Sequence, residues 1–285
     1  ARGAGAGPHA PQSPPGRGVD GPVMSACGGK PSIWLAALCL LLVAGCTSTA
    51  EREYEQNKYQ KLVDTNTQLG AGYLQQGQFE VAREKLDKAL ELGPNDPQAN
   101  SVMALLQWRL RNYDAAERHF RSALASKAGS INPDVQHNYG AFLCDRGRVE
   151  ESLPWFERAI ANQLYPTPEL ANLNAGLCVL KKPDRAAAER YFRQALARNP
   201  DLAPALLQMA KLNLEAGSAL PARGFMERYF RSGPETPESL LLATKIERAL
   251  GNRNAESSYA MRLKGKHPDA PETQEYLRAT GKGKK

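Results

Sequence analysis

Apolar residues between positions 63 and 270 recur with the spacing expected of amphipathic helices that pack in pairs. The pattern is clearest in residues 169–202, counted with Glu169 as position 1. Gly176 at position 8 and Ala188 at position 20 are small enough to let two helix axes approach to about 8–10 Å. Phe192 at position 24 can fill the space toward a neighbouring pair, and the proline at position 32 ends the second helix. The spacing therefore predicts a pair of antiparallel helices.

These offsets resemble the tetratricopeptide (TPR) repeat, a helical hairpin that stacks on others of its kind. The same offsets recur along the chain, although the last copy retains little beyond Ala260 and Pro268. The expected units span residues 63–96, 97–130, 133–166, 169–202, 203–236 and 237–270. We predict an all-α fold, a right-handed superhelical solenoid of about six TPR hairpins whose eroded last unit acts as a solubilising cap.

The residues before the repeats have the composition of a targeting region. Residues 1–23 are rich in Gly, Pro, Ala and Arg without an apolar period, so we expect a disordered or untranslated extension. Residues 24–45 have the layout of a secretion signal, with Lys30 before the apolar run Ile33–Leu42. This run is too short for a permanent membrane-spanning helix, and a membrane anchor helix is the alternative interpretation.

The end of this signal resembles a bacterial lipobox, formed by Val43, Ala44, Gly45 and Cys46. The resemblance implies cleavage before Cys46 and attachment of lipid to this cysteine, and we expect no other cofactor. Each buried CH₂ group contributes about 0.8 kcal/mol, so several acyl chains anchor a protein firmly. By the same resemblance, Thr47 after the cysteine favours the outer membrane. Residues 46–62 are then the lipidated cysteine and a polar tether, which face the periplasm.

Two of the five cysteines, Cys144 and Cys178, lie within the repeats. They occupy positions 12 and 10 of the first helices of consecutive units, and such neighbouring helices pack side by side. The periplasm is oxidising, so we predict a disulfide between them. Two buried free thiols are the alternative, since cysteine tolerates burial well.

Several segments around these cysteines resemble the central signature of the PilF/PilW family of type IV pilus biogenesis and stability lipoproteins. They are Asn138–Cys144, Gly147–Arg148, Phe156, Leu164–Pro168 and Asn174–Cys178. The resemblance extends from Cys46 to about Pro268, with departures in the eroded sixth unit and at Leu164, where a proline is expected. It implies a pilotin, an outer-membrane lipoprotein that helps the pilus secretin reach the outer membrane and assemble into a multimeric ring. The implied partners are the secretin subunit and, through the lipid, the inner leaflet of the outer membrane.

The charge pattern argues against a nucleic-acid partner. The formal net charge is +7, but basic residues alternate with Glu and Asp along the expected outward helix faces. Residues 271–285 are expected to form a basic tail, and Lys282, Lys284 and Lys285 are candidates for contact with an acidic surface.

Nothing in the sequence suggests catalysis. The four histidines, at positions 9, 119, 137 and 267, are too scattered for a metal cluster, and no Ser-His-Asp or Cys-His grouping shares an element. We expect no metal, no small-molecule substrate and no enzymatic activity.

Partner binding is expected on the concave face, which first-helix positions 2, 5, 9 and 12 line. The candidate groove residues of the first two units are Thr67, Leu74, Leu105 and Trp108. TPR domains that clamp a C-terminal carboxylate resemble one another in placing Lys and Asn at positions 5 and 9, where this chain has Thr67 and Ala71. We therefore predict that an apolar segment of the partner docks here, as a helix in a groove. A purely intramolecular packing role for Trp108 is the alternative.

The alternative function is that of a general periplasmic TPR lipoprotein scaffold for cell-wall enzymes or for the outer-membrane assembly machinery. Such an adaptor needs only the small and aromatic offsets. It has no reason to carry the Tyr-Pro-Thr-Pro loop and the cysteine pair, so the pilotin is the favoured interpretation.

Overall fold

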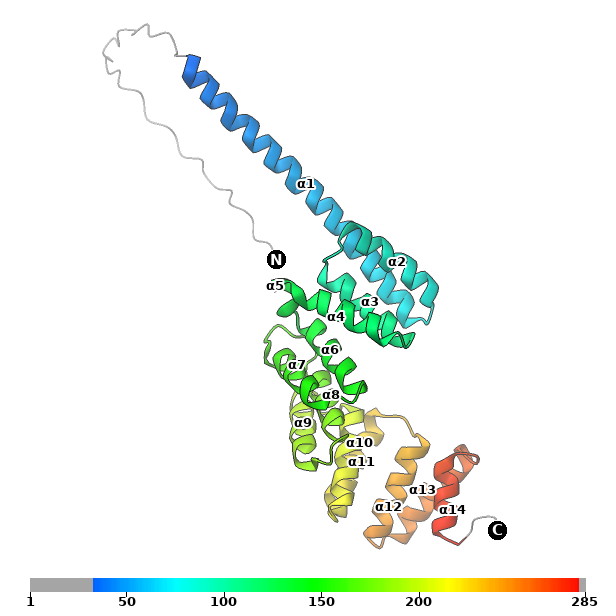
Figure 1. The fold of residues 1–285 in the computed structure, drawn as a ribbon. Helices are drawn as coiled ribbons and strands as arrows, with labels where there is room; N and C mark the ends of the chain where they lie inside the picture. Colours follow the sequence, from blue (N-terminus) through cyan, green and yellow to red (C-terminus); the bar gives the residue numbers. More distant parts are fainter. Residues whose placement is uncertain (1–32, 282–285) are drawn as a thin grey trace, which may run out of the picture. The chain divides into compact units, whose positions relative to one another are not determined.

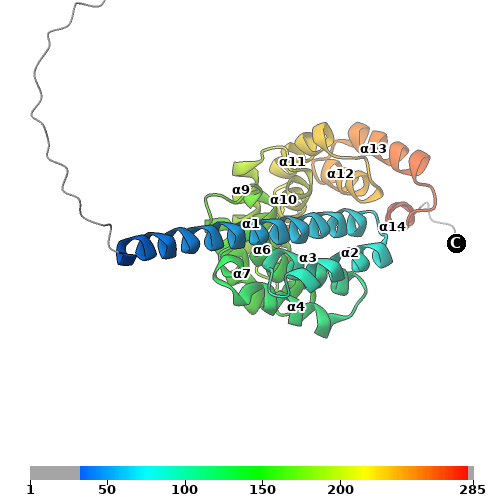
Figure 2. The same cartoon turned by 90° about the horizontal axis from the view of Figure 1, so that it is seen from above.

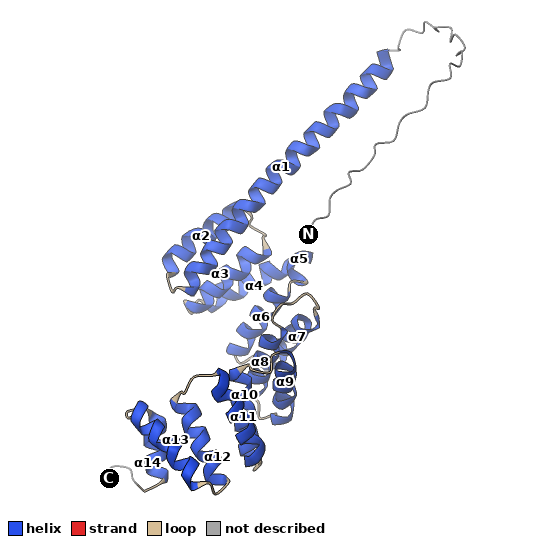
Figure 3. Ribbon diagram, turned by 180° about the vertical axis from the view of Figure 1, so that it is seen from behind, coloured by secondary structure: helices blue, strands red, loops and turns tan. Residues whose placement is uncertain are grey.

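A computed structural model describes the backbone of residues 33–281, with the side chains of Thr49 and of residues 51–281. The chain divides into two compact units, residues 1–54 and 55–285. Every regular element of the described backbone is a helix (Figure 3).

The predictions for the first 32 residues lie outside this described part. So do those for the side chains of the lipobox, Val43, Ala44, Gly45 and Cys46.

The helices are, in chain order, α1 (Ile33–Gln75), α2 (Phe79–Leu92), α3 (Pro97–Arg109), α4 (Tyr113–Ala125), α5 (Lys127–Ser130), α6 (Pro133–Asp145), α7 (Val149–Ala161), α8 (Pro168–Val179), α9 (Arg185–Arg198), α10 (Ala203–Glu215), α11 (Ala219–Ser232), α12 (Pro237–Ala249), α13 (Arg253–Lys266) and α14 (Pro271–Ala279).

The helices of the second unit pack in consecutive pairs. The pairs α3–α4, α6–α7, α8–α9, α10–α11 and α12–α13 each form a hairpin, and α7, α9 and α11 also pack on the helix that follows them. The hairpin α12–α13, for example, lies side by side in both views of Figures 1 and 2. The predicted all-α TPR solenoid is confirmed.

Local chemistry explains where the first helices of the hairpins begin. Proline lies in the first turn of α3, α6, α8, α10 and α12, where its missing N–H needs no partner. The Asp96 side chain caps α3 by accepting a hydrogen bond from the Ala99 N–H at 2.8 Å. The Asn132 side chain caps α6 through the N–H of Val135 at 3.2 Å. Proline thus marks the start of each of these helices, and a side-chain cap accompanies it at α3, α6 and α12.

The turn inside most hairpins requires a left-handed residue at position 15. Gly147 takes it in the third unit with φ of 77°, as glycine does readily because it lacks Cβ. In the second unit this residue is Arg111, with φ of 62°, a conformation that is costly for residues with a side chain. The hairpin geometry therefore overrides local preference at Arg111.

The two helices of a hairpin touch where the small residues were predicted. A Cβ atom on Gly176 would lie 2.6 Å from the Phe192 ring, and one on Gly70 would lie 2.6 Å from Leu86. Only glycine fits at such separations, so the predicted close approach at position 8 is confirmed. Phe192 is fully buried as a result.

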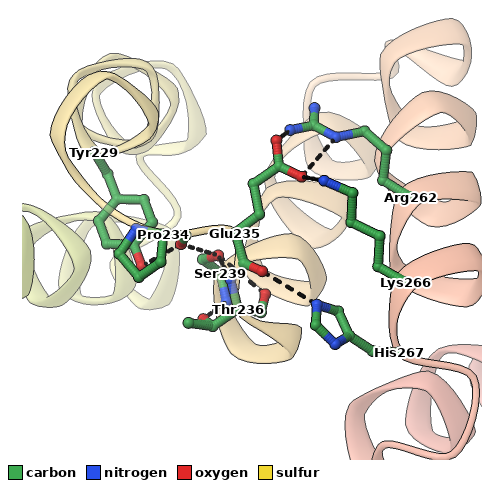
Figure 4. Close-up of polar contacts among 8 residues, drawn as sticks. All are labelled: Tyr229, Pro234, Glu235, Thr236, Ser239, Arg262, Lys266 and His267. Carbon is green, nitrogen blue, oxygen red and sulfur yellow. Dashed lines mark hydrogen bonds and ion pairs between the residues drawn. The ribbon is translucent and has the colours of Figure 1, made fainter.

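The sixth unit is a complete hairpin despite its eroded pattern. Thr236 and Ser239 form a capping box at the start of α12, with backbone-to-side-chain distances of 3.1 and 3.0 Å. Glu235, just before this box, reaches across to α13, where its carboxylate pairs with Arg262 and Lys266 (Figure 4). Polar contacts thus compensate for the missing small and aromatic residues.

The prediction of a basic tail was wrong for residues 271–279, which form α14. This helix packs on α12 and α13 and places Tyr276 and Leu277 against Leu263 and its neighbours. Together with the buried Thr273 they form a stripe at i, i+3 and i+4, which explains why the segment folds as a helix against this surface. The lysines after residue 281 lie outside the described part.

The polar tether expected at residues 46–62 is also helical, because α1 runs without interruption from Ile33 to Gln75. Residues 51–69 contain no glycine or proline and are rich in Glu, Lys, Gln and Arg, which favour helix. The sequence therefore has no signal that would end α1 before the first repeat.

Candidate interaction groove

Three of the four predicted groove residues lie together. Leu74 of α1 and Leu105 and Trp108 of α3 line a pocket of about 460 Å³, with Gln75 and Arg109 at its edge. We call this the first groove. Its apolar lining and polar edge suit an amphipathic segment of a partner.

Thr67 does not line the first groove. Its side chain is buried, at 3% exposure, and its hydroxyl has no hydrogen-bond partner among the described residues. Thr67 shares one face of α1 with Val63 and Gly70, and Gly70 meets Leu86 of α2. Position 5 of this unit therefore points into the hairpin, and the prediction that Thr67 contacts a partner was wrong.

Trp108 is both packed within the chain and part of the groove wall. Its indole Nε1–H donates a hydrogen bond to Asp145 Oδ2 at 2.8 Å, and its ring meets Phe142 edge-on, with centroids 5.7 Å apart. The same ring also lines a second hollow of about 310 Å³, together with Leu177 and Lys181. Trp108 thus forms the partition between two adjacent depressions.

The floor of the second hollow contains the two cysteines of the repeats. A disulfide joins Cys144 of α6 to Cys178 of α8 in the structure, with a Cα–Cα distance of 5.7 Å. The Lys181 ammonium donates to the Cys144 carbonyl oxygen at 2.7 Å, and the Ser152 hydroxyl lies 3.1 Å from Cys178 Sγ. These contacts tie the third unit to the fourth beneath the hollow.

His137 is a partly buried, neutral histidine that contacts residues of the third and fourth units. The Asn174 amide donates to His137 Nε2 at 2.6 Å, so the proton of the neutral ring sits on Nδ1, which contacts the Tyr165 hydroxyl. Burial lowers the pKa of His137 to about 4 and raises the pKa of Tyr165. The histidine therefore acts as a fixed connector between units at neutral pH.

The described side chains contain no group of three or more His, Cys, Asp or Glu residues arranged to hold a metal ion. No described helix has both the length and the apolar character of a membrane span.

Comparison with known proteins gives the family. The pattern described as a tetratricopeptide repeat matches residues 67–131, 101–169 and 143–203. The type IV pilus assembly protein PilF of Pseudomonas aeruginosa is 32% identical over 247 residues, which cover 85% of this chain and 97% of PilF. This chain belongs to the PilF/PilW family.

Solved structures of the PilF/PilW family agree in fold over nearly their whole length. The structure of P. aeruginosa PilF matches with a TM-score of 0.72 at 32% identity, covering 78% of this chain and 99% of that one. The crystal structure of PilW, a widely conserved type IV pilus biogenesis factor, matches with a TM-score of 0.68 at 34% identity, covering 75% and 98%.

Asp145, Leu177 and Lys181 line the second hollow but were not predicted from the sequence. Leu177 is position 9 of the fourth unit, so the rule applied to the first two units would have found it. Asp145 and Lys181 are both position 13, one residue beyond the positions considered, and each ends up beside the second hollow because α6 and α8 pack together. A helical-wheel comparison of all units would have shown this shared position.

Proposed function

We propose that this protein is a pilotin: an outer-membrane lipoprotein that binds the type IV pilus secretin subunit and promotes its outer-membrane localisation and multimer assembly. Pilus biogenesis and twitching motility depend on it for that reason. The protein contributes a binding surface and performs no bond-making chemistry of its own.

The main support is the likeness to PilF over almost its entire length. That relative is a type IV pilus assembly protein, and the 97% coverage includes the repeats that carry both hollows. A general periplasmic scaffold would need the TPR fold alone, which many unrelated proteins share.

The membrane attachment rests on the lipobox sequence that ends at Cys46. Acyl chains on Cys46 would hold the protein at the inner leaflet of the outer membrane, facing the periplasm. Each buried CH₂ group adds about 0.8 kcal/mol to such binding, so two or more chains make it durable.

The secretin contact rests on the first groove. Leu74 and Leu105 offer apolar surface from two successive units, while Gln75 and Arg109 supply polar groups at the edge. A short amphipathic helix or apolar turn of the secretin subunit fits this combination of chemistry.

Chromosomal replacement in the native host tests both parts. Cys46→Ser should move the protein out of the outer-membrane fraction and reduce secretin multimers, whereas Cys39→Ser, within the expected signal, should leave both unchanged. Leu105→Glu should reduce secretin multimers without releasing the protein from the membrane, because it places a charge in the first groove.

The matched control for the groove is Leu220→Glu, since Leu220 is 61% exposed and lies outside both hollows. Circular dichroism of each purified variant checks the fold. Normal secretin multimers and normal twitching in a full deletion strain would refute the pilotin proposal and favour the general scaffold.

A further inference from the structure

The junctions between consecutive units follow one packing rule. Positions 3, 7 and 10 of the first helix are at most 8% exposed in every unit from the second to the sixth. These residues are Ala99, Met103 and Leu106; Val135, Tyr139 and Phe142; Ala171, Ala175 and Cys178; Ala205, Met209 and Leu212; and Ser239, Ala243 and Ile246.

The covering surface comes from the second helix of the preceding unit. Phe120, at position 24 of the second unit, lies with its ring 5.4 Å from each of the rings of Tyr139 and Phe142 in the third. Phe156 and Ala159, at positions 24 and 27 of the third unit, share a core cluster with positions 3, 7 and 10 of the fourth. At four of the five junctions a large residue and an alanine, three residues apart, therefore meet the same three positions of the next helix. At the last junction the two residues are Met226 and Tyr229.

In the first unit these three positions are Thr65, Leu69 and Gly72, and no described residue covers them. Leu69 is 44% exposed, and a Cβ atom built on Gly72 meets nothing within 4 Å. Leu62 and Tyr59, 43% and 51% exposed, continue the stripe one and two turns toward the N-terminus at helical spacing. We call these five residues the open face of α1.

The opposite end of the stack is closed. Tyr276 and Leu277 of α14 join the cluster formed by Leu240, Leu241 and Leu263, so the last hairpin has no bare helix surface of this kind. A second copy of the chain therefore cannot continue the stack by placing its last hairpin on the open face.

We propose that the open face of α1 is a docking site for an amphipathic helix of a partner protein. That helix takes the place of the missing second helix of a preceding unit, and it carries a large apolar residue followed three residues later by Ala, Gly or Ser. The same three helix positions are covered by a preceding helix at every later junction, and Gly72 leaves room for close approach. This site lies on a different face from Leu74 of the first groove, so it does not depend on the partner proposed for that groove.

The chain itself supplies a probe of the correct chemistry. A fluorescein-labelled peptide of Arg185–Arg198 contains Phe192 and Ala195, which fill the junction between the fourth and fifth units. A hydrocarbon staple between positions 190 and 194, both solvent-exposed, stabilises the helix of so short a peptide. Fluorescence anisotropy with the full chain should show saturable binding with a Kd on the order of 10–100 μM.

Matched variants localise the binding. Leu69→Glu should weaken the peptide by about tenfold or more, because it charges the centre of the open face. Leu220→Glu makes the same change at another exposed leucine, outside the open face, and should leave the affinity unchanged. Replacing Phe192 by Ala within the peptide should weaken binding to a similar extent as Leu69→Glu. Because Leu69 is exposed, its variant should keep the native circular dichroism spectrum and melting temperature.

Site-specific photocrosslinking in cells then tests the occupant. A photoreactive residue at position 69 should yield an adduct with a different protein, absent when the probe is at position 220. Three results would overturn the proposal: no peptide binding at 1 mM, unchanged affinity in Leu69→Glu, or an adduct at position 69 made only of two copies of this chain.

Discussion

The indole N–H of Trp108 in the second unit donates a hydrogen bond to the carboxylate of Asp145 in the third, at 2.8 Å. Phe142, one turn before Asp145, meets the same indole edge-on. A groove residue is thus fixed by the neighbouring unit, and its orientation depends on how the two units stack.

The Trp108–Asp145 bond should contribute measurably to stability. Trp108→Phe and Asp145→Ala should each lower the free energy of unfolding by about 1–2 kcal/mol, since each removes one charge-assisted hydrogen bond. The double variant should cost little more than either single one, because the interaction is lost only once. Urea unfolding of the four proteins completes the cycle, and fully additive effects would show that the contact has no energetic weight.

Two substitutions of Trp108 distinguish a role of the indole ring in packing from a role in partner binding. Trp108→Phe keeps an aromatic wall between the two hollows and should preserve secretin multimers in cells. Trp108→Ala opens the wall and should reduce them. If both variants fold and give normal multimers, the ring serves only the fold and the secretin contact lies elsewhere.

The bond between Cys144 and Cys178 should stabilise the stack under oxidising conditions. It closes a loop with a sequence separation of 34 residues, which corresponds to about 3–4 kcal/mol in the chain-entropy description. Reductant should therefore lower the melting temperature of the wild type but not that of the Cys144→Ala/Cys178→Ala double variant. Alkylation of both cysteines in the unreduced, denatured protein would contradict the bridge.

His137 should make stability depend on pH in a defined window. Its pKa is about 4 in the folded chain and 6.5 is the ordinary value, so the unfolded chain binds the extra proton first as the pH falls. The stabilisation is complete above pH 6.5 and is lost progressively down to about pH 4, by an amount on the order of 3 kcal/mol. His137→Gln should flatten this part of the profile. An NMR titration midpoint of His137 near 6.5 in the folded protein would contradict the assignment.

The Glu235 contacts should stabilise the last hairpin locally. Glu235→Gln removes the charge that pairs with Arg262 and Lys266, and should cost about 1 kcal/mol, less at high salt. Hydrogen exchange should speed up in α12 and α13 while α6 and α7 stay protected. Glu227→Gln is the control, because Glu227 is largely exposed and its ion pair with Arg223 is long, at 3.6 Å. Equal exchange in the two variants would show that the Glu235 cluster adds nothing.

The repeated elements were predictable because each depends on a fixed offset within one hairpin. Gly176 and Phe192 identify a contact that recurs wherever the offset recurs, and three of the four groove residues follow from the same numbering. The prediction for Thr67 was wrong because position 5 is buried against the chain itself in this protein, as Ser101, Leu173, Leu207 and Leu241 show in later units.

Other features arise only when units stack. His137 contacts Tyr165 and Asn174, which lie 28 and 37 positions away in the sequence, so no local pattern predicts these contacts. α14 was not predicted for a different reason. It follows the last unit of the repeat template, which ends at residue 270, and it contains only two large apolar residues, Tyr276 and Leu277, that dock it on the existing surface.

The closure of one end by α14 also limits what the molecule can assemble into. Head-to-tail contacts between identical subunits produce filaments whenever both ends of a stack are adhesive. Because Tyr276 and Leu277 cover the terminal surface, this end of the stack does not offer the bare helix positions that a second copy would need to extend it. We therefore expect that removal of Pro271–Ala279 exposes this surface and allows head-to-tail association.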